Sequence, residues 1–327
     1  MRVTPRYIQP ADGGLRCDLC PHRCLIADGR SGFCGVRTNS GGKPDLPYAG
    51  LLSTAALDPI EKKPLYHYHP GEMIYSIGFY GCNLRCPFCQ NYAISQEFIR
   101  GGERRSPEET AAEAAGSGSF GIAYTYSEPL VHFEFLMETA ALARERGLKN
   151  ILVSNGFLNP EPAAEILSLM DAANIDLKSF SDDFYRRTLK GSLAPVLDFI
   201  RLAARKTHLE VTTLVIPGQN DSVREIGEIA RFLAGLDPEI PLHMSCYVPR
   251  YKYRVRATTG SDLLPLLHEA RRHLVYVYPG NIAGDADTRC PRCGALLIRR
   301  SGYRVEIVHE AGGFCGNCGK EIPLRRD

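Results

Sequence analysis

From about Met73 onward, the chain alternates short apolar runs with longer amphipathic stretches. Short apolar runs predict buried strands, whereas the longer stretches repeat their apolar residues at the spacing of a helix. The predicted strands cover residues 73–79, 121–125, 150–154, 174–177, 209–216, 242–248 and 274–278. The predicted helices between them cover residues 107–115, 130–146, 160–170, 193–206, 222–236 and 262–272.

This alternation predicts an α/β fold. Strands that alternate with helices form a parallel sheet, which is either closed or partly closed into a barrel. Helix-start signals support the assignment, since Ser106 can cap a helix that begins at Pro107. In such folds ligands bind at the carboxyl ends of the strands, so we expect the functional residues to follow the strands directly.

The barrel is predicted to span residues 73–284, with a cysteine-rich segment at 1–48 and a linker at 49–72. The first segment has almost no periodic apolar pattern and is too short to bury a core, so a metal would substitute for one. Its four cysteines are the candidate ligands of structural zinc, which we favour, or of an auxiliary [4Fe-4S] cluster that relays electrons. These residues are Cys17, Cys20, Cys24 and Cys34.

Residues 285–327 contain two C-x2-C-G knuckles separated by a predicted hairpin over 296–300 and 303–308. Paired knuckles of this kind indicate a zinc ribbon, in which four thiolates close a tetrahedral site. A single iron ion would fit the same ligands, but a folding role for zinc is the preferred interpretation. The predicted ligands are Cys290, Cys293, Cys315 and Cys318.

Composition places the chain among ordinary globular proteins. It has 327 residues, 23% of them charged, and a net charge of +2, so no overall field favours nucleic acid or an anionic membrane. The sequence contains neither a signal peptide nor an apolar stretch of transmembrane length, which predicts a cytoplasmic protein. Thiols stay reduced there, so the 12 cysteines are expected to be metal ligands rather than disulfides. Cys246 stands alone and is expected to be a small buried hydrophobe.

Three cysteines follow the first predicted barrel strand with the spacing C-x3-C-x2-C: Cys82, Cys86 and Cys89. A [4Fe-4S] cluster held by cysteines normally uses four of them. Three thiolates leave one iron without a protein ligand, and an open coordination position is where a metal centre performs chemistry. A structural zinc knuckle would need a fourth ligand, and none follows nearby. The loop therefore predicts a catalytic cluster.

The C-x3-C-x2-C loop of Cys82, Cys86 and Cys89 resembles the cluster-binding loop of the radical SAM superfamily. The resemblance implies a partial (β/α)6 barrel in which the open iron binds S-adenosylmethionine (SAM). Reductive cleavage of SAM then yields a 5′-deoxyadenosyl radical that abstracts hydrogen from a substrate. Phe88 matches an aromatic position that lies near the adenine in that superfamily, although simple packing of the loop would also explain it.

Further segments resemble the branch that contains pyruvate formate-lyase activating enzyme. In this branch, Glu128 and Lys178 would bind the amino and carboxylate groups of SAM, Asn155 would contact its ribose or the substrate, and Asp176 belongs to the Asp-x-Lys motif. Tyr126 and Ser127 replace two glycines of the branch motif. Alternative interpretations are an acid at a helix N-terminus favoured by the helix dipole for Glu128, a turn at Asn155 and a surface ion pair between Asp176 and Lys178. A Pro217-Gly218 turn is a weaker match.

The whole chain, flanks included, resembles the AmmeMemoRadiSam-system radical SAM proteins, on the evidence of the terminal cysteine segments and of the run from Asp58 to His67. His67 and His69 are expected to be loop histidines with aromatic neighbours. The subgroup implies no substrate.

Two substrate classes therefore stay open. A glycyl-radical activase would abstract hydrogen from a backbone glycine of a partner enzyme. The alternative is oxidation or alkylation of a small molecule, a protein side chain or an RNA base. A reductant such as flavodoxin or ferredoxin is expected as a partner in both cases. Binding to a membrane is not expected. A non-catalytic zinc scaffold that binds nucleic acid or protein would leave the strand-end motifs unexplained.

Overall fold

The computed structural model describes residues 4–99, 101–282 and 286–326. Its centre is a sheet in the order β15-β14-β13-β12-β11-β10-β8-β7. All neighbours from β8 to β15 are parallel, and β7 is antiparallel to β8. The strands are β7 (Thr54–Pro59), β8 (Met73–Gly78), β10 (Gly121–Thr125), β11 (Lys149–Ser154), β12 (Ala172–Asp176), β13 (His208–Val215), β14 (Leu242–Cys246) and β15 (Val277–Gly280).

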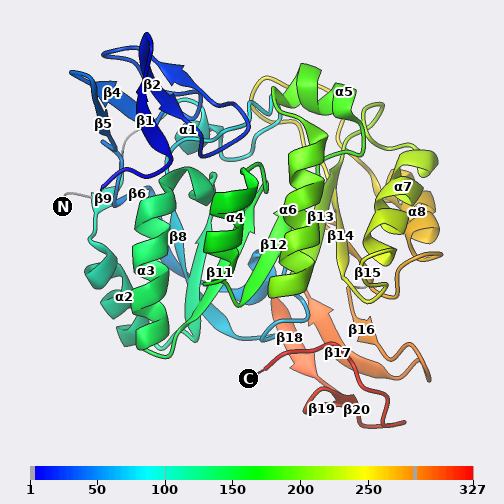
Figure 1. Cartoon of the computed structure of the whole chain (residues 1–327). Helices are drawn as coiled ribbons and strands as arrows, with labels where there is room; N and C mark the ends of the chain where they lie inside the picture. The colour runs from blue at the N-terminus through cyan, green and yellow to red at the C-terminus, as the bar shows by residue number, and fades with distance from the viewer. Residues whose placement is uncertain (1–3, 100, 283–285, 327) are drawn as a thin grey trace.

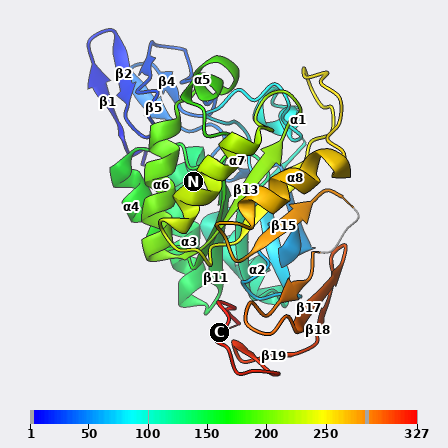
Figure 2. The same ribbon diagram turned by 90° about the vertical axis from the view of Figure 1, so that its right-hand side faces the viewer.

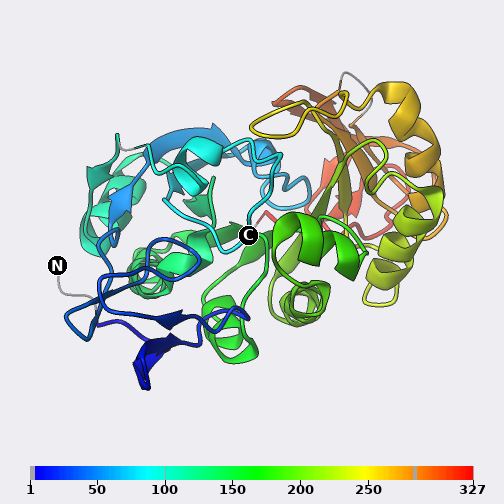
Figure 3. The same cartoon turned by 90° about the horizontal axis from the view of Figure 1, so that it is seen from above.

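Helices cover the outer face of this sheet, which curves into an open barrel (Figures 1 and 3). The longer helices are α2 (Pro107–Gly116), α3 (Phe133–Glu145), α4 (Pro160–Leu167), α6 (Leu193–Lys206), α7 (Val223–Ala234) and α8 (Gly260–Ala270). The shorter helical turns are η1 (Ile60–Lys62), α1 (Tyr92–Ser95), η2 (Pro129–His132), α5 (Asp182–Phe184) and η3 (Tyr185–Leu189). The alternation of strands and helices therefore produces the predicted α/β architecture.

Local sequence explains why these elements form. Ser106 accepts a hydrogen bond from the Glu109 backbone and Glu109 reciprocates, which completes a capping box at the start of α2. All five residues of β10 are buried, as expected for a strand covered on both faces. The predicted strands and helices are confirmed, with end points that differ by a few residues.

The structure corrects the prediction of a linker at 49–72. β7 lies in this segment and pairs with β8 from Thr54–Gly78 to Pro59–Met73. Asp58 is its one buried residue in an otherwise exposed or half-buried strand, so the apolar signal on which strand prediction depends is missing. A second short pair, β6 (Leu51–Leu52) with β9 (Glu103–Arg104), also begins in this segment.

The chain after β7 crosses the amino-end side of the barrel and is held there by a buried carboxylate. Glu210, from β13, accepts hydrogen bonds from the backbone N–H groups of Tyr66 at 2.9 Å and His67 at 2.7 Å. His67 Nε2 lies 2.7 Å from the Tyr278 hydroxyl, and the His69 ring stacks on Phe120. Both histidines thus have the aromatic neighbours that the sequence predicts.

The two cysteine-rich flanks lie at opposite ends of the barrel (Figures 1 and 2). The N-terminal segment packs at the carboxyl ends of the strands and contains β1 (Ile8–Ala11), β2 (Gly14–Cys17), β3 (Leu25–Ile26), β4 (Thr38–Ser40) and β5 (Lys43–Asp45). The C-terminal ribbon lies at the amino ends and contains β16 (Thr288–Arg289), β17 (Leu296–Ser301), β18 (Arg304–Ile307), β19 (Glu310–Ala311) and β20 (Phe314–Cys315). The boundary predicted at 284/285 lies outside the described residues.

A buried ion pair fixes the N-terminal segment to the barrel. The Arg37 guanidinium donates two hydrogen bonds of 2.9 Å to the Glu134 carboxylate in α3, and both side chains are almost fully buried. Such paired geometry is the strong form of an Arg–carboxylate contact.

Among the described residues, no helix is long and apolar enough to cross a membrane.

A second buried ion pair ties the end of β7 to the site. The Asp58 carboxylate accepts hydrogen bonds from Lys62 and Lys63, both at 2.7 Å, and from the Tyr126 hydroxyl. Burial alone would raise the pKa of Asp58, but the two lysines and Tyr126 hold it well below its usual value. The Lys63 side chain is 1% exposed, so its ammonium depends on this carboxylate.

We predict that Asp58→Asn lowers the free energy of unfolding by about 3 kcal/mol, because it leaves a buried ammonium unpaired. Because the folded state lowers the pKa of Asp58, its stabilisation is present above the unfolded pKa and is lost as pH falls through the folded value. Urea titrations at several pH values measure this. Tyr126→Phe is the control, with an expected loss of about 1 kcal/mol. Equal stability of Asp58→Asn and the wild type would contradict the prediction.

Candidate active site

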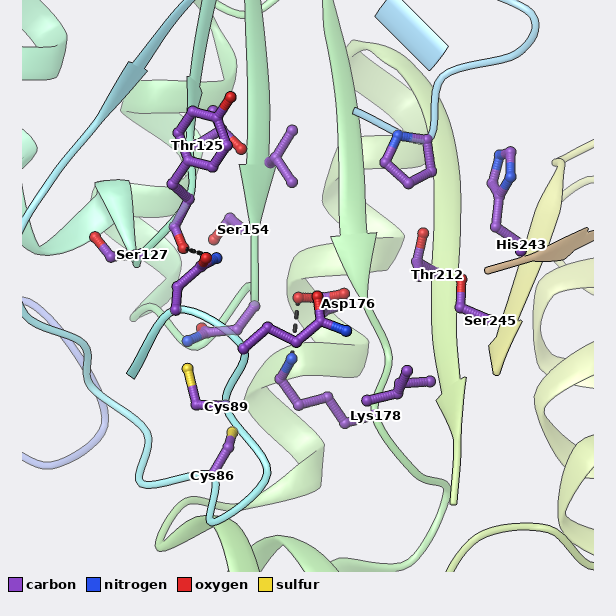
Figure 4. A pocket seen from close by; sticks show the side chains of 18 of the residues that line it. Cys86, Cys89, Thr125, Ser127, Ser154, Asp176, Lys178, Thr212, His243 and Ser245 are labelled. Carbon is purple, nitrogen blue, oxygen red and sulfur yellow. Dashed lines mark hydrogen bonds and ion pairs between the residues drawn. The ribbon is translucent and has the colours of Figure 1, made fainter. Parts of the chain in front are cut away.

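The carboxyl ends of the parallel strands meet at a cavity of about 490 Å³ inside the barrel. Cys86 and Cys89 line one end, and His243 lines a distant part of the wall (Figure 4). Every sequence-predicted site residue of the barrel lines this one cavity: Cys82, Cys86, Phe88, Cys89, Glu128, Asn155, Asp176 and Lys178. Parallel pairing explains the convergence, because it brings the ends of successive strands to one edge.

The three-cysteine loop (residues 81–91) leaves β8 through a turn that only glycine fits easily. Gly81 has φ +80°, and a Cβ there would lie 2.5 Å from the Cys34 carbonyl oxygen. Within the loop, the Leu84 N–H points at Cys82 Sγ at 3.3 Å, and Ser95 Oγ lies 3.2 Å from Cys89 Sγ. A polar hydrogen therefore already faces Cys82 Sγ, and the Ser95 hydroxyl is placed to donate to Cys89 Sγ once that sulfur is a thiolate.

Burial disfavours the thiolate form of these sulfurs. It raises the pKa of the Cys86 thiol to about 12 and that of Cys82 well above its usual value. Metal binding would displace these protons and supply the missing positive charge. The three sulfurs do not all lie within 4.8 Å of one another, unlike the C-terminal four. This wider spacing fits a cluster, in which each thiolate binds its own iron, better than it fits a single ion.

Glu128 is a buried carboxylate that joins the segment after β10 to the end of β11. It accepts hydrogen bonds from Ser154 Oγ at 2.7 Å, from the Asn155 N–H at 2.9 Å and from the Leu130 N–H at 3.0 Å. Burial raises the pKa of Glu128 to about 7, although these hydrogen bonds lower it. The last bond caps the helical turn η2, so Glu128 does stand at a helix N-terminus, the position that the sequence offered as an alternative. Oε2 has one bond only, so it can still accept a donor from a ligand.

Asn155 connects the third barrel strand to the three-cysteine loop. Its Nδ2 donates to Asn83 Oδ1 at 2.9 Å and points at Cys82 Sγ at 3.7 Å, while its Oδ1 accepts the Phe157 N–H. Asn83 in turn donates to the Phe157 carbonyl. Sequence analysis missed Asn83 because a single Asn in a loop carries no spacing signal. Its role depends on a residue 72 positions away.

Asp176 is the last residue of β12 and Lys178 follows the strand, and their side chains form an ion pair of 2.9 Å beside the cavity (Figure 4). Burial would lower the pKa of the Lys178 ammonium, but the Asp176 carboxylate raises it above its usual value. The predicted mutual ion pair is therefore present, and it lines the cavity rather than a remote surface. Lys178 also lies close enough to Cys86 to lower the pKa of that thiol.

Phe88 is 4% exposed and lies between the rings of Phe184 and Tyr253, with centroids 6.3 and 5.8 Å away. It lines the cavity next to the cysteines. Both the packing role and the ligand-facing role that the sequence offered are compatible with this position.

Further cavity residues come from segments that the sequence analysis did not connect with the site. Glu61, Lys62 and Tyr66 follow β7, His243 belongs to β14, and Tyr303 lies in the ribbon hairpin. The run from Asp58 to His67 matches only a subgroup, and it is the crossing of the chain under the barrel that brings Glu61, Lys62 and Tyr66 to the cavity. No motif identifies His243 or Tyr303.

The C-terminal cysteines form a compact set. Cys290 and Cys318 sulfurs are 3.5 Å apart, and those of Cys293 and Cys315 are 3.7 Å apart. A tetrahedral zinc with Zn–S bonds of 2.3 Å places its sulfurs about 3.8 Å apart. The four residues therefore fit a single ion, and the structure agrees with the predicted ribbon.

Comparison with known proteins gives a consistent result. The radical SAM superfamily profile matches residues 76–233. A protein of Methanocaldococcus jannaschii, MJ0808, whose function is uncharacterised, is 37% identical over 99% of both chains. GTP 3′,8-cyclase of Moorella thermoacetica is 31% identical over 73% of this chain and 74% of its own. A pyruvate formate-lyase-activating enzyme of Listeria monocytogenes is 25% identical over 48% of this chain and 67% of its own.

Among solved structures, Streptococcus suis SuiB bound to S-adenosylmethionine superposes with a TM-score of 0.51 at 13% identity, over 66% of this chain and 50% of that one. This likeness supports the fold alone. The finer AmmeMemoRadiSam assignment stays a prediction. The relatives include named enzymes, which excludes the non-catalytic scaffold. With its cysteine loop, its cavity and these relatives, the chain belongs to the radical SAM superfamily and is an iron–sulfur, SAM-dependent enzyme.

Proposed function

We propose that this enzyme abstracts hydrogen from a small polar molecule bound inside the barrel. The observation that carries the proposal is the charged wall of the cavity beyond the cysteines, which contains Glu61, Lys62 and His243. The cluster and SAM, once bound, supply the 5′-deoxyadenosyl radical. The remaining question is which groups of this chain would recognise the hydrogen donor.

Glu61 has unused capacity to bind a ligand. Its side chain is buried, and Oε1 accepts the Gly71 N–H at 2.8 Å. Oε2 has no hydrogen-bond partner in the described part of the chain. A buried oxygen without a partner is costly, and a substrate donor would satisfy it. Burial raises the pKa of Glu61, so a cationic substrate group would also favour its charged form.

Neighbouring residues supply donors as well. Lys62 is 41% exposed and shares Asp58 with the buried Lys63, so its ammonium can bind an anionic group of the substrate. His243 Nε2 lies 2.6 Å from Glu210 Oε2, and this contact fixes the imidazole ring at the cavity wall. A backbone glycine offers only one N–H and one carbonyl, so its recognition requires neither an acidic nor a basic side chain. A small molecule with ionic groups can pair with both an acidic and a basic side chain of the cavity wall.

At the other end of the cavity, Cys82, Cys86 and Cys89 would hold the cluster. Glu128 Oε2 and Lys178 would bind the amino and carboxylate groups of SAM, with Asp176 orienting Lys178. Asn155 and Phe88 would contact its nucleoside part. The ion pair and hydrogen bonds already present hold these side chains in place, so little rearrangement is needed on binding.

A backbone glycine of a partner enzyme is the second candidate, favoured by the pyruvate formate-lyase-activating relatives. GTP 3′,8-cyclase, by its name, acts on a small molecule, and its match covers more of this chain. A one-electron donor such as flavodoxin or ferredoxin, structural zinc in the ribbon and a cytoplasmic location belong to the same proposal.

The substrate class can be tested with deuterium. Cells of the source organism grown in heavy water yield an extract that dialysis divides into small molecules and macromolecules. We expect the protein, with dithionite and unlabelled SAM, to transfer deuterium into 5′-deoxyadenosine from the small-molecule fraction. Mass spectrometry of the nucleoside measures this. Transfer from the macromolecular fraction alone would reject the small-molecule proposal in favour of a protein or RNA substrate.

Cys86→Ala is predicted to abolish formation of 5′-deoxyadenosine under dithionite, because two thiolates cannot retain the open-iron cluster. Chromatography of the anaerobic reaction checks this. Cys246→Ala, a change in a buried cysteine of β14, is the matched control and should retain activity. Normal nucleoside formation by Cys86→Ala would refute the cluster assignment.

Glu128 is predicted to make SAM binding pH-dependent. Its pKa of about 7 means that the carboxylate becomes charged as pH rises, and only the charged form attracts the SAM ammonium. We expect affinity to increase about tenfold between about pH 6 and 8. Anaerobic calorimetry measures this, and Glu128→Gln should show weak binding without that slope. The same slope in the variant would assign Glu128 a purely structural role.

A further inference from the structure

The four N-terminal cysteines gather beside the three-cysteine loop. Cys17 and Cys34 are buried, Cys20 and Cys24 are half-buried, and all four contribute to packing around the loop. The thiols lie close enough to interact: Cys20 has Cys17, Cys24 and Cys34 as neighbours, and Cys17 is a neighbour of both Cys24 and Cys34. Four thiols so close together, away from water, indicate a metal site.

The spacing of the sulfurs distinguishes between the possible metals. Within residues 4–99, 101–282 and 286–326, one set of three or more Cys, His, Asp or Glu ligand atoms has all members within 4.8 Å of each other, and it is the C-terminal ribbon set. No three of the N-terminal sulfurs meet that limit, although tetrahedral zinc would place them about 3.8 Å apart. The Cys82, Cys86 and Cys89 sulfurs show the same wider spacing.

The contacts around this set lead directly to the catalytic loop. The Arg85 guanidinium stacks on the Phe33 ring at 4.2 Å, donates to the Phe33 carbonyl and lies near the Cys24 thiol. His22 Nε2 lies 2.8 Å from the Asn83 carbonyl oxygen. The Cys34 carbonyl packs against Gly81, the neighbour of Cys82. Only a few residues therefore separate the two groups of sulfurs.

We propose that Cys17, Cys20, Cys24 and Cys34 bind a second [4Fe-4S] cluster, with a cysteine on every iron, against the outer face of the three-cysteine loop. This replaces the structural zinc that the sequence favoured. A cluster with four protein ligands has no open iron for SAM, so its chemistry is electron transfer. Its place next to the catalytic loop suits it to receive an electron from the external carrier protein and pass it to the catalytic cluster.

Metal analysis of the anaerobically purified and reconstituted full chain tests this proposal without an activity assay. We expect about eight irons per chain and about one zinc, the latter from the ribbon. The Cys82→Ala/Cys86→Ala/Cys89→Ala variant should retain half of the iron, as a cluster whose electron paramagnetic resonance signal does not respond to SAM. Cys20→Ala/Cys24→Ala should lose the other half and keep a SAM-responsive signal.

Cys246→Ala is the control for cysteine removal and should keep all the iron. About four irons and two zincs in the wild type would overturn the proposal, as would an iron-free catalytic-loop variant. About six irons would also overturn it, because it would indicate a two-iron cluster. The catalytic-loop variant leaves the N-terminal segment intact, so the test does not depend on whether Cys20→Ala/Cys24→Ala folds.

Discussion

The buried carboxylate of Glu128 is the contact on which the geometry of the site depends. It receives hydrogen bonds from Ser154 and Asn155 at the end of the next strand, and Asn155 reaches from there to Asn83 and Cys82. A carboxylate in this low-dielectric environment is stable only while these donors surround it. The same bonds therefore position the strand ends and the cysteine loop relative to one another.

Two buried ion pairs fix the flanking segments to the barrel. Arg37 and Glu134 join the N-terminal segment to α3, and Asp58 with Lys63 joins the end of β7 to Tyr126 beside the cavity. Removing one partner from such a pair costs more than the pair contributes, because the remaining charge is left in the interior. The flanks are thus fixed parts of the barrel, one at each end of the cavity.

In each of the three cysteine groups, the distances between the sulfurs indicate which kind of metal centre the group fits. The ribbon sulfurs approach each other to the distances of a single tetrahedral ion. In the described residues, neither of the other two groups has three sulfurs that all lie within 4.8 Å of one another, which fits an iron–sulfur cluster better than a single ion. Of these two, the N-terminal group has four cysteines and could close its site, whereas Cys82, Cys86 and Cys89 would leave one iron open. In our proposal, this difference would separate an electron carrier from a catalyst within one chain.

The sequence by itself determined the order of strands and helices, the position of the cysteine loop after β8 and the placement of Glu128, Asn155, Asp176 and Lys178 at strand ends. These follow from local periodicity and from the rule that parallel strands share an edge. The tertiary structure alone decided that β7 joins the sheet, that Glu61 and Tyr303 border the cavity, that Asn83 contacts Asn155, and that the N-terminal sulfurs do not gather within 4.8 Å of one another. Each of these depends on contacts between residues distant in the chain, for which a local pattern carries no signal.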